Sequence, residues 1–207
     1  SPALGYVEKL EYLAVVWGTM VMAASGFVLW FDTWSLAHFP KWLMDAATGA
    51  AVQVTRGALH VTGLDWSPDG KRLALAGQPT PGVPDNFKSD VYTLDMAKAL
   101  AALREAKAPE EALAEPVPVV TTRGTDSSPR FSPDGTVLVF LTQDGNDEWY
   151  TNQYVATVPA AGGAPRVVTR AFDEEADNPR FSADGRSILF EGQARLASHI
   201  FSVPAAG

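Results

Sequence analysis

The chain has 207 residues, a net charge of −8 at pH 7 and no cysteine. Its 16 lysine and arginine residues are scattered, which argues against the clustered basic face that nucleic-acid binding requires. Without cysteine there is no disulfide framework, thiolate metal site or thiol nucleophile. The length allows one domain or two, and the composition divides the chain into two unlike parts, residues 1–49 and 50–207.

The first part contains twenty consecutive uncharged residues, 12–31, with the sequence YLAVVWGTMVMAASGFVLWF. Twenty helical residues rise about 30 Å, the thickness of a bilayer core. Aromatic residues gather towards both ends, as is typical of headgroup depth. The run predicts one transmembrane helix, with a buried helix of a soluble protein as the alternative. Residues 35–47 repeat apolar side chains at helical spacing, which predicts a short interfacial helix.

Two stretches of this first part, GYVEKLEYLAVVWGTMVMAASGFVLWFDTW and FPKWLMDAAT, carry a family resemblance. Residues 5–48 resemble a membrane-helix segment of the diheme cytochrome b subunits of formate dehydrogenases and thiosulfate reductases. In that family a haem-ligating histidine follows the second stretch, but here the chain continues GAAVQVTRG. His38 does not match a ligand position. The resemblance therefore implies a membrane anchor, and we assign no haem or other cofactor.

From residue 50 the sequence becomes a series of short strands in which one turn phrase recurs. The phrase is SPDG at 67–70 and 132–135, and SADG at 182–185. Proline presets φ at the second turn position, aspartate tolerates the third, and glycine can adopt a left-handed conformation at the fourth. An apolar strand follows each copy, and a further strand follows later. The phrase therefore predicts a hairpin turn, and its Ser–Asp pair is structural rather than a nucleophile motif.

The spacing of the phrase indicates the architecture. The serines lie 65 and then 50 residues apart, and the first interval holds a polar, alanine-rich segment, residues 95–116, that predicts a surface helix and loop. Removing it leaves roughly 45 residues, the length of a four-stranded propeller blade. The sequence thus predicts a mainly β fold in which residues 50–207 form about three four-stranded blades of an incomplete propeller. Each phrase marks the inner hairpin of one blade.

The phrases SPRFSPDGTVLVFLTQDGNDEWY and VPAAGGAPRVVT carry a second resemblance. Residues 50–207 resemble the N-terminal β-propeller of serine peptidases of the prolyl oligopeptidase family, of the dipeptidyl-aminopeptidase and acylaminoacyl-peptidase type, with weaker similarity to TolB-like propellers. The resemblance implies a propeller that screens access to a separate α/β-hydrolase domain. The chain has no G-x-S-x-G elbow, and His38, His60 and His199 lack triad neighbours in sequence. We therefore assign no catalytic, cofactor-binding or metal residue.

Two acidic segments suggest binding chemistry. Asp144, Asn146 and Glu148 alternate as in a calcium loop, but the glycine and glutamate that such a loop needs are replaced by Trp149 and Val155. This segment is expected to be a solvated hairpin tip. Residues 171–179, AFDEEADNP, hold four acidic residues. They are expected to form an exposed loop, with the binding of a substrate amine as the alternative.

These observations favour a non-catalytic propeller portion of a prolyl-oligopeptidase-type serine peptidase, tethered to a membrane, that recognises peptides or gates their access. The alternatives are a stand-alone propeller scaffold and a remnant cytochrome b subunit fused to propeller repeats. The expected partners are peptide or protein substrates, further blades and a hydrolase domain in the same or another chain, and a membrane. An extracytoplasmic propeller is favoured. An open stack of three blades exposes an apolar blade face, which predicts self-association or marginal stability.

Overall fold

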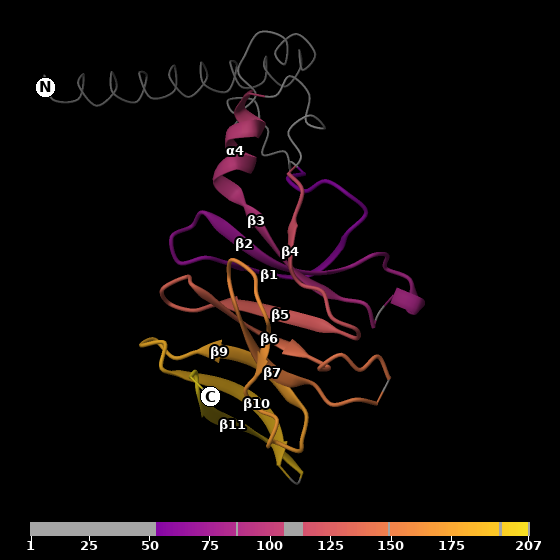
Figure 1. The fold of residues 1–207 in the computed structure, drawn as a ribbon, viewed down its shortest axis with the longest axis vertical. Coiled ribbons are helices and arrows are strands. Elements are labelled where there is room, and N and C mark those ends of the chain that lie inside the picture. Colours follow the sequence, from indigo (N-terminus) through magenta and orange to yellow (C-terminus); the bar gives the residue numbers. More distant parts are fainter. Residues whose placement is uncertain (1–52, 86, 106–113, 149, 195, 207) are drawn as a thin grey trace, which may run out of the picture. The chain divides into compact units, whose positions relative to one another are not determined.

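The computed structural model describes residues 53–85, 87–105, 114–148, 150–194 and 196–206 (Figure 1). The predicted transmembrane helix, the interfacial helix and the segment resembling cytochrome b lie outside these residues. No helix within the described residues is both long enough and apolar enough to span a membrane. Residues Val54–Gly207 form one compact unit.

This unit consists of three antiparallel sheets, each a meander of strands consecutive in sequence. The first contains β1 (His60–Trp66), β2 (Arg72–Gln78), β3 (Asp90–Asp95) and β4 (Val117–Val120). The second contains β5 (Asp126–Phe131), β6 (Val137–Thr142), β7 (Tyr154–Pro159) and β8 (Arg166–Val167). The third contains β9 (Ala176–Phe181), β10 (Ser187–Ala194) and β11 (Ala197–Pro204). We call these sheets the first, second and third blades.

Four strands are confirmed for the first two blades, and the third has three strands in the described part of the chain. The surface helix predicted within residues 95–116 is confirmed: α4 (Met96–Glu105) follows β3 in the first blade. Asp95 caps this helix by accepting a hydrogen bond from the Lys98 N–H at 2.9 Å.

The recurring phrase forms the predicted hairpin turn in all three blades. Its glycines have φ of 67°, 71° and 70°, the left-handed region that glycine adopts without strain. In the second blade the Ser132 hydroxyl donates to Asp134 at 2.5 Å and accepts from the Val137 N–H at 3.0 Å. The third blade keeps this arrangement although alanine replaces proline there. The serine and aspartate side chains therefore maintain the turn without proline.

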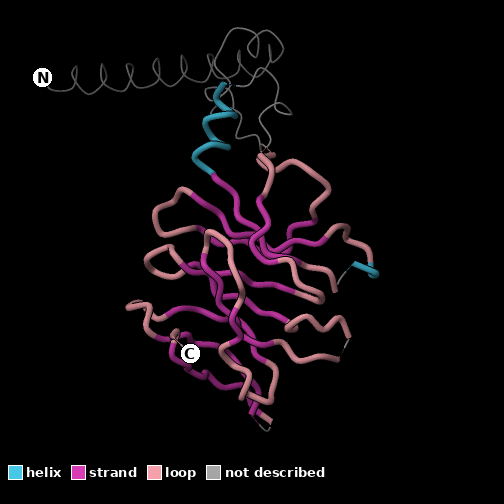
Figure 2. Tube along the Cα trace, in the orientation of Figure 1, coloured by secondary structure: helices cyan, strands magenta, loops and turns pink. Residues whose placement is uncertain are grey.

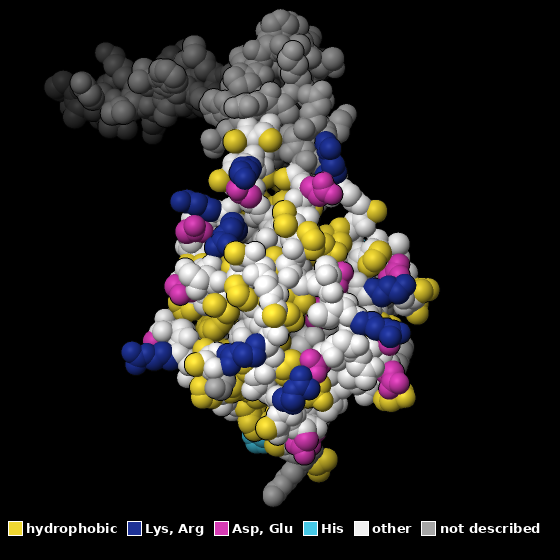
Figure 3. Space-filling view, in the orientation of Figure 1, with side chains coloured by type: hydrophobic (Ala, Val, Ile, Leu, Met, Phe, Trp, Pro, Cys, Tyr) yellow, Lys and Arg dark blue, Asp and Glu magenta, His cyan; other side chains and the backbone are white. Residues whose placement is uncertain are grey.

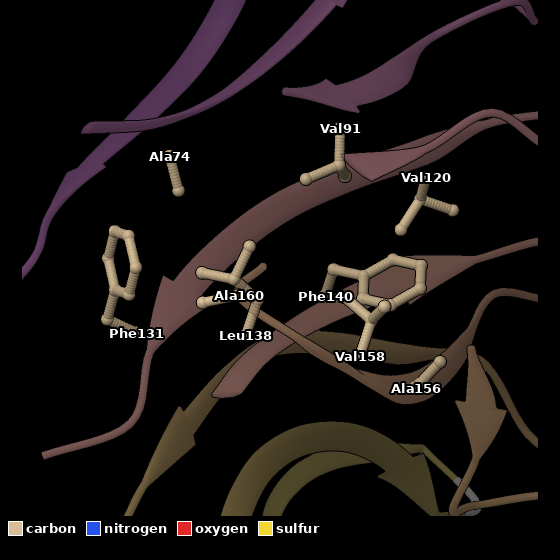
Figure 4. Close-up of a cluster of buried hydrophobic side chains, with 9 residues drawn as sticks. All are labelled: Ala74, Val91, Val120, Phe131, Leu138, Phe140, Ala156, Val158 and Ala160. Atoms are coloured by element: carbon tan, nitrogen blue, oxygen red, sulfur yellow. The ribbon is translucent and has the colours of Figure 1, made fainter. Parts of the chain in front are cut away.

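The blades are stacked face to face, with the second between the other two (Figures 1 and 2). Strand β6 is buried on both faces, which explains its unbroken apolar sequence VLVFL. Its residues Leu138 and Phe140 join a cluster with Ala74, Val91 and Val120 of the first blade (Figure 4). The alternate residues of β6 pack instead towards the third blade, in a cluster that includes Val139, Leu141, Ile188 and Phe190.

The turns of neighbouring blades meet at one end of the stack. The Arg72 guanidinium donates to the Gly135 carbonyl at 2.7 Å and lies 5.3 Å from the centre of the Phe131 ring. A Cβ atom added to Gly135 would lie 3.4 Å from Pro68 of the preceding turn. We call this the turn end of the stack. The opposite ends of the same strands form the loop end.

Candidate functional site

The loop end of the third blade contains a hollow of about 280 Å³ that is lined by acidic side chains. Its carboxylates are those of Glu175, Asp177 and Glu191, and we call it the acidic hollow. All three residues are exposed. The remaining lining comes from the second blade and from β9, β10 and β11: Gln153, Ala176, Gly192, Gln193 and Ser198. The hollow therefore lies across the ends of several strands.

A bulge in β9 sets the positions of these carboxylates. The register of β9 against β10 shifts between Arg180 and Asp177, and Asn178 has a φ of 48°. Asparagine tolerates this left-handed conformation better than most residues. The Asn178 side chain donates to the Glu191 carboxylate at 2.8 Å, and its backbone N–H donates to Asp177 at 2.7 Å. A bulge of this kind re-aims side chains at a strand end.

Asp177 and Glu191 are direct partners in the register of β9 and β10. Like charges placed opposite each other on neighbouring strands destabilise a sheet. A cation or a protonated amine between the two carboxylates would relieve this repulsion. The acidic hollow is therefore suited to bind a positively charged group.

A larger cleft, of about 530 Å³, lies at the loop end between the first and second blades. Its two basic side chains are already paired, because Arg123 binds Asp147 at 3.0 Å and Lys88 binds Asp85 at 2.9 Å. The rest of its lining comprises Pro79, Pro84, Phe87, Asp90, Thr122 and Gly124. Charges of both signs are also interspersed over the face seen in Figure 3. The lining contains two basic and two acidic side chains, so the cleft has no net charge when Asp90 is ionised.

Asp90 of the first blade, which lines this cleft, and Asp126 of the second blade lie near enough for their charges to interact. Asp126 is fully buried, and the hydroxyl and N–H of Thr122 donate to its Oδ2 at 2.6 and 3.3 Å. Burial raises the pKa of Asp126 above its usual value. Burial, together with the charge of Asp126, raises the pKa of Asp90 to about 6. These two aspartates therefore place titratable carboxyl groups at the contact between the first two blades.

The histidines and the possible calcium loop do not assemble a reactive site. His60 begins β1 and His199 lies in β11, so they belong to different blades, while His38 lies outside the described residues. Asp144 forms an ion pair with Arg170 at 2.6 Å. The segment 144–148 is exposed, as expected of a hairpin tip. No group of three potential metal ligands occurs in the part of the chain that the structure describes.

Among the features noted in the sequence, the acidic stretch 171–179 is part of the candidate site. It contributes Glu175 and Asp177 to the acidic hollow, but sequence reasoning missed Glu191. A signal was present, because Glu191 occupies the repeat position of Leu141, a fully buried residue of the second blade. A charged residue at a repeat position that is otherwise apolar indicates that this position has a different role in the third blade.

No protein-family model matches the chain, and no curated protein matches it significantly. Solved structures do match. A presumed TolB from Agrobacterium tumefaciens is 16% identical with a TM-score of 0.51, over 72% of this chain and 47% of that one. The β-propeller domain of the Trilobed protease from Pyrococcus furiosus is 10% identical with a TM-score of 0.46, over 72% and 40%. A puromycin-hydrolyzing peptidase of Mycobacterium tuberculosis is 16% identical with a TM-score of 0.49, over 75% and 24%.

These likenesses concern the fold. The described part of the chain has a β-propeller-like fold similar to that of the TolB structure. The chain spans less than half the length of each of these matched structures. The comparisons give no support to the cytochrome b resemblance of residues 5–48.

Proposed function

We propose that this chain is the non-catalytic propeller portion of a serine peptidase of the prolyl oligopeptidase type, and that it recognises the peptides that reach the hydrolase. The observation that supports this most is the stack of blades built on one recurring turn, with a TM-score of 0.51 to a TolB structure. The sequence contains no G-x-S-x-G elbow, so hydrolysis is assigned to a separate domain in the same or another chain. Residues 12–31 serve as the membrane tether.

The acidic hollow gives this proposal a place where a peptide can be held. A peptide carries a protonated amine at its N-terminus, and the exposed carboxylates of Glu175, Asp177 and Glu191 attract it. The hollow is open to solvent, so this attraction weakens as salt is added. Recognition of the terminal amine would orient the peptide before it reaches the hydrolase.

The test is the binding of one fluorescent pentapeptide with a free N-terminus and of its N-acetylated counterpart to the full chain, followed by fluorescence anisotropy. We expect the free-amine peptide to bind at least tenfold more tightly. A Glu175→Gln, Glu191→Gln variant should abolish that preference. A Glu148→Gln variant is the control, because it removes an exposed carboxylate of the second blade that does not line the hollow. Equal binding of both peptides, or an equal loss in the control, would overturn the proposal.

A further inference from the structure

The turns of the second and third blades enclose a pocket of about 230 Å³ at the turn end of the stack. Its lining includes Val137 of the second blade, and Phe181 and Gly185 of the third. We call it the turn pocket. It is smaller than the clefts that hold drug-sized ligands, so it suits a group about the size of one side chain.

The equivalent place between the first and second blades is filled by an arginine. The turn phrase aligns the blades residue by residue, and the counterparts are Arg72 and Val137, Phe131 and Phe181, and Gly135 and Gly185. The Arg72 guanidinium donates to the Gly135 carbonyl at 2.7 Å and lies 5.3 Å from the centre of the Phe131 ring. This separation is within the range of a cation–π interaction. The first contact between blades therefore holds a guanidinium in a site built from a ring and a carbonyl.

The second contact between blades keeps the frame of this site but not the arginine. A Cβ atom added to Gly185 would lie 3.6 Å from the proline of the preceding turn, and the same distance is 3.4 Å for Gly135. The turns therefore stack in the same way at both contacts. The side chain of Val137 has no hydrogen-bond donor, so it does not replace Arg72 as the partner of the glycine carbonyl. Phe181 and Gly185 are only partly buried, whereas their counterparts at the first contact are buried.

The turn pocket also carries negative charge. Asp134 and Asp184 line it, and each accepts a hydrogen bond from the serine hydroxyl of its own turn, at 2.5 and 2.6 Å. These bonds hold the pKa of both carboxyls below the usual value, so both are ionised at neutral pH. None of the described residues that line the pocket is basic, although the Arg166 guanidinium donates to the carbonyl of one of them, Ala205, at 2.6 Å. The pocket therefore favours a positively charged ligand.

We propose that the turn pocket binds a guanidinium group from outside the stack, carried by an arginine side chain of another protein or by a free guanidino compound. The group stacks on the Phe181 ring and donates to the Gly185 carbonyl, as Arg72 does at the first contact. A guanidinium fits better than an ammonium, because its planar fork stacks on a ring and donates at the same time. The pocket lies at the turn end and the acidic hollow at the loop end, so this proposal does not rest on peptide recognition by the hollow.

The test uses Nα-acetyl-L-arginine methylamide as the probe, titrated into the full chain in mild detergent and followed by nuclear magnetic resonance of the backbone amides. We expect the Gly185 amide to shift saturably, and the Gly135 amide to keep its position because Arg72 already fills that site. The matching citrulline compound, which is neutral and similar in shape, should bind at least tenfold more weakly. No saturable shift at Gly185, or equal binding of the two compounds, would overturn the proposal. The acetyl group removes the amine that the acidic hollow is proposed to bind, so this result is independent of the proposed function.

Two arginine substitutions locate the site. Val137→Arg places the arginine of the first contact in the turn pocket, so it should abolish the shift of the Gly185 amide. Thr136→Arg is the matched control, because it adds the same charge at an exposed neighbour that does not line the pocket, and it should still bind the probe. Undiminished binding by Val137→Arg, or an equal loss in Thr136→Arg, would contradict the proposal.

The reverse change, Arg72→Val, empties the equivalent site between the first two blades. The Gly135 amide should then shift with the probe as well, and a Gly135 amide that stays unresponsive in the folded variant would count against the site described. An N-acetylated Gly-Gly-Arg-Gly-Gly peptide distinguishes the two sources of the group. Binding equal to that of the probe indicates that a free guanidino compound suffices, whereas at least tenfold tighter binding indicates that a protein segment supplies it, and both results support recognition of the guanidinium.

Discussion

Replacement of Phe140 by alanine probes the packing between the first two blades. The side chain is fully buried and lies among residues of both blades (Figure 4). Burying a phenylalanine contributes about 1.5–3 kcal/mol by transfer from water. The cavity left by truncation adds to this loss, so Phe140→Ala should lower the free energy of unfolding by about 3–5 kcal/mol. Because domains are stable by only about 5–15 kcal/mol, the variant should be close to unfolding.

The assay is urea unfolding of the full chain, followed by far-ultraviolet circular dichroism. Val83→Ala is the matched control, because Val83 is exposed in the short 3₁₀ helix η1 (Val83–Asp85), and its truncation should change stability by less than about 0.5 kcal/mol. The slope against urea should be the same for both variants. A loss below about 1 kcal/mol for Phe140→Ala would refute the packing described for the two blades.

Three further predictions concern turns and titration. Gly124→Ala should lower the free energy of unfolding by more than about 2 kcal/mol, because the φ of 93° is strained for alanine and a Cβ atom would lie 2.1 Å from a backbone oxygen. Gly145→Ala is the control, because its φ is similar but its Cβ atom would meet no such clash. Its loss, measured by thermal unfolding, should be only about 1–2 kcal/mol. Ser132→Ala leaves the Val137 N–H without its acceptor and should lower the free energy of unfolding by about 1–2 kcal/mol. An unchanged midpoint of urea unfolding would contradict this expectation. The pKa of Asp90 is raised to about 6, so the folded state binds more protons than the unfolded state between about pH 4 and 6, and stability falls as pH rises through that range. Asp90→Asn should therefore stabilise the protein at pH 7.5 but not at pH 4. If the variant shifts the urea midpoint equally at both pH values, ionisation of Asp90 is not the cause.

The repeat was sufficient to predict the blades, because the turn depends on local chemistry. Serine, aspartate and glycine at fixed positions fold the hairpin through contacts within a few residues. The apolar sequence of β6 likewise predicts burial on both faces. The fourth strand of the third blade was predicted by analogy with the other repeats, and the described residues do not contain it.

The candidate site was only partly predictable, because it depends on pairing across strands. The sequence identified the acidic stretch that supplies Glu175 and Asp177 but not its partner Glu191, which lies in the next strand. The electrostatic interaction of Asp90 with Asp126 was not predicted, because it joins two blades and the residues are 36 positions apart in the sequence. Local patterns therefore predicted the elements, whereas the register between strands and blades determines the chemistry.

The most direct test of the stacked blades is the exchange rate of one backbone amide. The Phe131 N–H, in the second blade, donates to the Asp65 carboxylate of the first blade at 2.9 Å. Hydrogen exchange followed by nuclear magnetic resonance should find this amide protected in the native chain and exchanging at least tenfold faster in Asp65→Ala. The neighbouring Ser132 amide, which bonds within its own sheet, should change little. Rapid exchange of the Phe131 amide in both proteins would contradict the stacking of the first two blades.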